Sequence, residues 1–167
     1  MNSTPNRTTQ DGSPWWASVG LATLLGVVWF SLHLRFDLPN DVNEVVRQAA
    51  LSRELLLSEP WRVVTASLLH IGSGHLLLNL ILAVTFGHTL AVLTHTQWTW
   101  SIFFVSGWVG SVVAACIHGG WLLGASAGIF GLLGAITISL SQTGKPGAQS
   151  QALFVGALGI LLSIVGS

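Results

Sequence analysis

Between Val63 and Gly144 the chain contains no Lys, Arg, Asp or Glu. In soluble domains roughly a quarter of all residues are charged. A region without any charged residue cannot form a soluble surface. Over the whole chain, 51% of residues are hydrophobic and only 7% are charged. The sequence therefore predicts an integral membrane protein, and the lipid bilayer is its first expected partner.

Four apolar segments are long enough to cross the bilayer as helices. At 1.5 Å per residue, about 20 residues match a hydrocarbon core of about 30 Å. The segments are Trp15–Leu34, His75–Leu93, Trp98–Ile117 and Trp121–Leu140. The connections Thr94–Gln97 and His118–Gly120 are short, which makes neighbouring helices antiparallel. We expect an all-α, polytopic transmembrane helical bundle.

The two ends of the chain differ from this central part. Residues 1–14 are rich in Ser, Thr, Asn and Pro, which is typical of a disordered polar tail. Residues 15–167 are expected to form one membrane domain with four complete spans and a partial fifth, because the last apolar run, 152–167, is short for a span. The single Cys116 excludes an intrachain disulfide and a multi-cysteine metal site. A formal net charge of zero gives no indication of a nucleic-acid partner.

The long first connection, residues 35–74, holds nine of the twelve charged side chains. Asp41 with Glu44 has the spacing of a capping box at the start of a helix. The next apolar residues recur at helical spacing, so this short helix has one apolar face and is expected to lie along the membrane surface. Those residues are Val42, Val45, Val46 and Ala49.

Small residues recur at helical spacing in the fourth apolar segment. They are Gly124, Gly128, Gly131 and Gly134, with Ser126 among them. Glycines at such spacing let helix backbones approach closely in lipid, and a serine there is often hydrogen-bonded to its own helix. The pattern alone is therefore compatible with simple helix packing.

Three polar residues are expected at similar depth in the bilayer. His75 and Asn79 lie one turn apart on one helix face, with Asn79 about 6 Å past His75. If the fourth helix begins at Trp121, Ser126 lies about 7.5 Å along it, from the same membrane side. A serine nucleophile with imidazole and amide donors for an oxyanion would suit acyl transfer. Interhelical hydrogen bonding that only stabilises the bundle is the alternative for His75 and Asn79.

An ordered set of motifs between residues 59 and 140 resembles the rhomboid intramembrane serine proteases. The set is Trp61-Arg62-Val-Val-Thr65, His70, His75-Leu-Leu-Leu-Asn79, Phe86-Gly87 and Gly124-Ala-Ser126. The resemblance implies that Ser126 is the nucleophile and that His75 and Asn79 form the oxyanion hole. It implies supporting roles for His70, for Trp61 and Arg62 in a membrane-embedded first loop, and for Gly124, Gly128 and Gly131. It also implies transmembrane protein substrates and a multi-pass protein of a bacterial cytoplasmic membrane with its N-terminus in the cytoplasm. We expect no cofactor and no metal.

Two features depart from the family pattern. His88 follows Phe86-Gly87 where the family often has a glutamate. The family's general base is a histidine on a sixth span, whereas no histidine follows Ser126 in this sequence. We therefore expect a C-terminally truncated rhomboid-type chain whose general base is unassigned and whose activity is absent or nearly so.

These residues leave three functions to distinguish. A protease lineage is favoured by Ser126 together with His75 and Asn79. A non-catalytic rhomboid-like protein that binds transmembrane helices is favoured by the missing base. A channel or transporter would need charged residues along a path or broken helices in corresponding halves, and neither pattern is present. The sequence predicts neither the substrate nor the oligomeric state.

Overall fold

The computed structural model describes residues 15–37, 40–117, 120–142, 147 and 150. Its elements are helices α1 (Trp15–Arg35), α2 (Val42–Ala49), α3 (Arg62–Leu68), α4 (Ser73–Leu93), α5 (Thr96–Ile117) and α6 (Ser126–Ser141). Across these described ranges the only β pairing is an isolated bridge, so the predicted all-α helical membrane bundle is confirmed. The predicted polar tail and the last apolar run lie outside the described residues.

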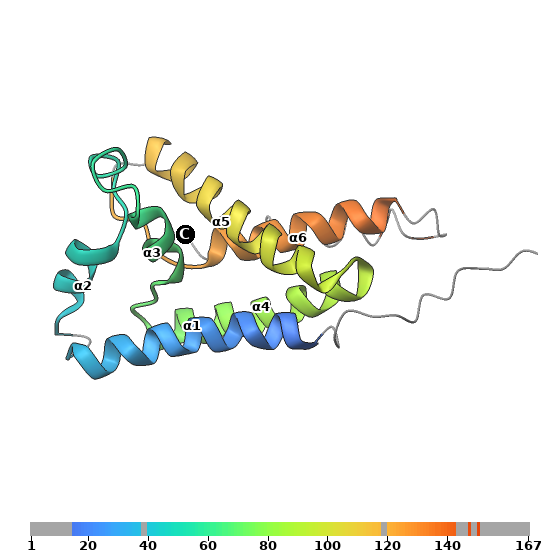
Figure 1. Ribbon diagram of the computed structural model, residues 1–167, viewed down its shortest axis with the longest axis horizontal. Coiled ribbons are helices and arrows are strands. Elements are labelled where there is room, and N and C mark those ends of the chain that lie inside the picture. The colour runs from blue at the N-terminus through green and yellow to red at the C-terminus, as the bar shows by residue number, and fades with distance from the viewer. Residues whose placement is uncertain (1–14, 38–39, 118–119, 143–146, 148–149, 151–167) are drawn as a thin grey trace, which may run out of the picture.

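The long helices form two pairs, α1 with α4 and α5 with α6, and α5 crosses α6 in the view of Figure 1. Helix α1 packs along α4, α5 packs along α6, and contacts between α4 and α6 join the two pairs. The connection between α1 and α4, with the short helices α2 and α3, occupies one end of the bundle, on the left in Figure 1. We call this end, which carries residues 36–37 and 40–72, the loop end. Both α4 and α6 begin there.

Three helices are long and apolar enough to cross a bilayer: α1, α4 and α5. Their bounds agree with the first three predicted segments to within two residues at either end. Helix α6 has 16 residues and is shorter than these three. At 1.5 Å per residue it extends about 24 Å, which is less than the thickness of the hydrocarbon core.

The prediction that the fourth helix begins at Trp121 is wrong. Residues 121–125 are not helical, because Leu122 pairs with Leu51 and Gly124 has a φ of 113°. A positive φ is easily adopted only by glycine, and it turns the chain before the helix starts. Ser126 is therefore the first residue of α6 rather than a residue one and a half turns inside it.

The predicted glycine packing is found at two of the four positions. A Cβ atom on Gly128 would lie 2.7 Å from the Phe103 carbonyl oxygen, and one on Gly131 would overlap the Ser106 side chain. These two glycines let α5 and α6 approach closely, as small residues do in membrane bundles. Gly134, in contrast, faces open space.

Apolar side chains from all four long helices form the main core. Leu21 and Leu25 of α1, Leu90 of α4 and Leu132 of α6 have no exposed surface. At the end of the α1–α4 pair away from the loop end, the His88 ring stacks on Trp15 with ring centroids 3.8 Å apart. The residue that departs from the family pattern thus belongs to the contact between α1 and α4.

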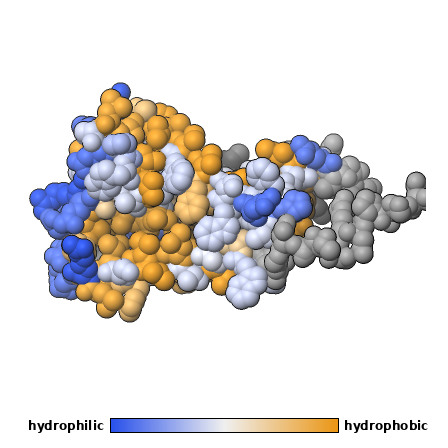
Figure 2. All heavy atoms as spheres, viewed as in Figure 1, coloured by the Kyte–Doolittle hydropathy of each residue, from blue (hydrophilic) through white to orange (hydrophobic). Residues whose placement is uncertain are grey.

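Helix α2 forms where the sequence predicts it, but two details differ. The capping box is not formed: the Asp41 carboxylate accepts the Asp37 N–H, and Glu44 pairs with Arg47. The apolar face of α2 packs inside the protein, where Val45 is buried against Leu69. Figure 2 shows hydrophilic surface gathered at the loop end and hydrophobic surface over the middle of the bundle.

Candidate active site

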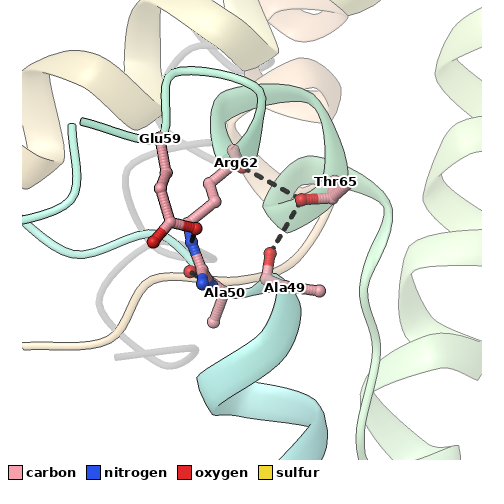
Figure 3. A network of polar contacts seen from close by, with 5 residues as sticks. All are labelled: Ala49, Ala50, Glu59, Arg62 and Thr65. Carbon is pink, nitrogen blue, oxygen red and sulfur yellow. Dashed lines mark hydrogen bonds and ion pairs between the residues drawn. The ribbon is translucent and has the colours of Figure 1, made fainter. Parts of the chain in front are cut away.

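A buried arginine organises the loop end. The Arg62 guanidinium donates to the Glu59 carboxylate at 2.8 Å and to the Ala50 carbonyl at 2.9 Å. One turn further along α3, the Thr65 hydroxyl donates to the Ala49 carbonyl at 2.8 Å (Figure 3). These bonds satisfy carbonyls at the C-terminal end of α2, which have no partners within that helix. Helix α3 and the end of α2 are thereby fixed to each other.

Residues next to this network bind the segment that precedes Ser126 through main-chain hydrogen bonds. Leu51, next to Ala50, exchanges two main-chain hydrogen bonds with Leu122, of 3.0 and 2.7 Å. The Ala66 carbonyl of α3 accepts the Gly124 N–H at 2.8 Å. The long first loop therefore fixes the conformation of residues 122–124 through main-chain bonds.

Ser126 is the first residue of α6 and is half-buried, next to the buried Ala125. The first N–H groups of a helix have no acceptors within it, and the positive end of the helix dipole lies there. The preceding residue is Ala125, which provides no side-chain cap. A hydroxyl is thus placed beside uncapped N–H groups that could bind a developing negative charge.

His70 is completely buried between these elements. Its Nδ1 lies 3.2 Å from the Leu68 carbonyl, so this nitrogen carries the proton and Nε2 is an acceptor. Nε2 faces the Asn79 amide nitrogen at 3.0 Å and accepts a longer bond, 3.5 Å, from the Ala125 N–H. Burial lowers the pKa of His70 from 6.5 to about 4, with a smaller lowering effect from the nearby His75. The ring is therefore neutral at physiological pH.

Asn79 and His75 extend the cluster along α4. Asn79 is buried, and its amide group donates to the His75 carbonyl at 3.1 Å as well as to His70. The His75 ring is exposed, meets the His70 ring edge-on at 5.2 Å and lies against Gly124. A Cβ atom on Gly124 would be 3.0 Å from the His75 Cε1 atom.

The predicted site residues thus fall into three groups. His70, His75 and Asn79 lie together with the Gly124–Ser126 segment. Gly128 and Gly131 lie on the face of α6 toward α5. Arg62 is buried in the loop network, and Trp61 covers its guanidinium at 4.8 Å while remaining half exposed.

Sequence reasoning missed the main-chain pairing that holds the serine segment. Neither Leu51 nor Ala66 has a side chain whose type indicates such a bond, because the bonds use backbone atoms only. His70 was expected to have only a supporting role, and its three polar contacts were not foreseen. Among the described residues, no group of three or more His, Cys, Asp and Glu side chains is arranged to hold a metal ion.

Comparison with known proteins agrees with this geometry. The Rhomboid domain family matches residues 57–166, which is well over half of the chain and includes α3 to α6. No curated protein and no solved structure matches the chain significantly. From this match, the apolar helices and the clustered motifs, we conclude that the chain is an integral membrane protein and belongs to the Rhomboid domain family, a family of intramembrane serine proteases.

Proposed function

We propose that the cluster around Ser126 is the serine site of a rhomboid-type intramembrane endopeptidase that cleaves transmembrane segments of other membrane proteins. Ser126 is the nucleophile that attacks the substrate carbonyl. His75 and Asn79, with the free N–H groups at the start of α6, form the oxyanion hole. The supporting observation is the His75 ring lying against Gly124, just before a serine at an uncapped helix end.

Each of these groups suits its proposed task. His75 is exposed, so its ring is accessible to a substrate that enters from the loop end. Loss of one oxyanion donor costs serine proteases about a hundredfold to a thousandfold in kcat. Asn79 is buried and already donates to two acceptors, so it contributes less to the oxyanion than His75 does.

The proposal assigns no described residue to the general base. His70 cannot take the proton, because its Nε2 already accepts from Asn79 and burial disfavours its charged form. A serine hydroxyl attacks an amide slowly unless a base removes its proton. A non-catalytic function, the binding of transmembrane helices, is therefore the second candidate for the same site.

The two candidates differ in the reactivity of Ser126. The 167-residue protein, reconstituted in vesicles, is treated with a serine-reactive fluorophosphonate and with a model transmembrane substrate, with and without added imidazole. If the site is catalytic, added imidazole can act as the general base that no described residue provides, and it increases both labelling and cleavage. Ser126→Ala removes both, whereas Ser141→Ala, an exposed serine at the other end of α6, changes neither.

Two outcomes would contradict the protease proposal. Substrate that binds the vesicles without cleavage, with no labelling of Ser126 at any imidazole concentration, contradicts the protease and supports the helix-binding protein. Labelling that persists in Ser126→Ala shows that another residue reacts, and also contradicts the proposal.

A further inference from the structure

One buried imidazole connects α4 to the peptide that precedes the proposed nucleophile. His70 accepts from Asn79 of α4 and from the main-chain N–H of Ala125 through the same nitrogen, Nε2. Its other nitrogen donates to the Leu68 carbonyl. Because each contact at Nε2 is with a donor, all three are satisfied only when Nε2 carries no proton.

We propose that His70 is a positioning residue, whose unprotonated Nε2 holds the Gly124–Ser126 turn in the orientation that presents Ser126, and that protonation of the ring releases this turn. The proposal deepens the proposed function, on which its activity measurement rests. A proton on Nε2 would face the Asn79 amide hydrogens and the Ala125 N–H, so both contacts would become repulsive.

The surroundings of the ring favour the neutral form. The titratable group that faces His70 from α4 is His75, and the segment Gly124–Ser126 presents its main chain to the ring. The one charged side chain of α3, Arg62, is directed to Glu59 and the Ala50 carbonyl instead. The complete burial of His70 adds to the penalty on its charged form.

The asparagine contact allows a test that leaves His70 intact. Asn79→Asp replaces a donor by an acceptor of nearly the same shape, which pairs with a protonated Nε2. We expect the midpoint of the His70 titration to move up by at least one pH unit in this variant. Asn43→Asp makes the same chemical change at an exposed position of α2 and should leave the titration unchanged.

Nitrogen NMR on the full chain with isotopically labelled histidine reports the tautomer directly. Variants of the other histidines to glutamine assign the spectrum by elimination, since the signal that persists in all of them belongs to His70. In the wild type, we expect Nδ1 protonated and Nε2 bare at neutral pH, and the Ala125 amide signal to shift as His70 titrates. The proposal is overturned if Nε2 is protonated at neutral pH, or if the Ala125 amide signal does not shift as His70 titrates. Both measurements use the wild type, so they hold even if Asn79→Asp fails to fold.

The activity measurement follows Ser126 labelling against pH. Loss of labelling on the acid side should move up in Asn79→Asp together with the His70 titration, and stay in place in Asn43→Asp. Labelling that does not follow the His70 titration overturns the positioning role. If the wild type is labelled at no pH, the proposed function fails, and the His70 and Ala125 signals still decide whether the imidazole holds the turn.

Discussion

Leu51 and Leu122 form a reciprocal main-chain pair that joins the first loop to the segment leading into Ser126. Leu51 itself follows Ala50, whose carbonyl is held by Arg62. A continuous set of contacts therefore runs from the buried arginine to the proposed nucleophile. Loss of Arg62 should therefore disturb the position of Ser126, although the two residues belong to different helices.

Replacing Arg62 by alanine should destabilise the protein substantially. The change leaves the buried Ala50 carbonyl without its donor, which costs about 1–3 kcal/mol, and leaves the Glu59 carboxylate, whose side chain is 35% exposed, without its partner. Arg47→Ala is the matched control, since its pair with Glu44 is largely exposed and such pairs contribute about 0–1 kcal/mol. Thermal unfolding in detergent micelles measures both. Equal losses in the two variants would contradict the role given to Arg62.

The α5–α6 interface makes a second prediction about stability. In Gly128→Ala the new methyl group would lie 2.7 Å from the Phe103 carbonyl oxygen, which belongs to the backbone and cannot rotate away. Overpacking of this kind costs roughly 1–3 kcal/mol. Gly134→Ala, on the same helix, meets nothing within 4 Å and should be neutral or slightly stabilising. The prediction fails if Gly134→Ala lowers the unfolding temperature as much as Gly128→Ala does.

Much of this fold follows from hydropathy, and the exceptions have physical causes. An uncharged apolar run predicts burial in lipid, but it does not distinguish a helix from a short extended segment. Hydropathy therefore predicts a helix from Trp121, whereas main-chain bonds of Leu122 to Leu51 and of Gly124 to Ala66 keep this segment out of the helix. Periodicity likewise identified four glycines without showing that Gly134 faces away from α5.

The sequence predicts the depth of the candidate site residues in the membrane more readily than their individual hydrogen bonds. The helical rise predicts only that His75, Asn79 and Ser126 lie at similar depth, because α4 and α6 begin on the same side, and it does not predict that they are neighbours. The hydrogen bonds of Asn79 were not predictable, since its amide could have faced a neighbouring helix, the substrate or His70. Asp41 shows the same limit: its spacing to Glu44 fits a capping box, yet each carboxylate found another donor.

The topology of the bundle can be tested by labelling introduced cysteines in a Cys116→Ala background. Ser58 and Gly120 lie at the loop end, and His95 lies in the connection between α4 and α5 at the opposite end. An impermeant thiol reagent should therefore label cysteines at positions 58 and 120 from one side of sealed vesicles, and a cysteine at position 95 from the other. Labelling of all three from the same side would refute the crossing of α4 and α5.

The low pKa of His70 predicts that stability decreases in acid. In the folded protein the pKa of His70 is about 4, whereas in the unfolded chain it returns to about 6.5. Between these values the unfolded state binds more protons than the folded state, so the free energy of unfolding falls as pH decreases from about 6.5 to about 4. The total decrease from this residue is on the order of 3 kcal/mol, and it is complete below pH 4.

Unfolding temperatures measured across this pH range test the prediction with two variants. His70→Gln cannot titrate, so its unfolding temperature, although lower, should depend less on pH between 6.5 and 4 than that of the wild type. His95→Gln changes an exposed imidazole and should keep the wild-type pH dependence. If His70→Gln retains the full acid dependence, the proton that destabilises the folded protein binds elsewhere, and the buried, neutral state of His70 is contradicted.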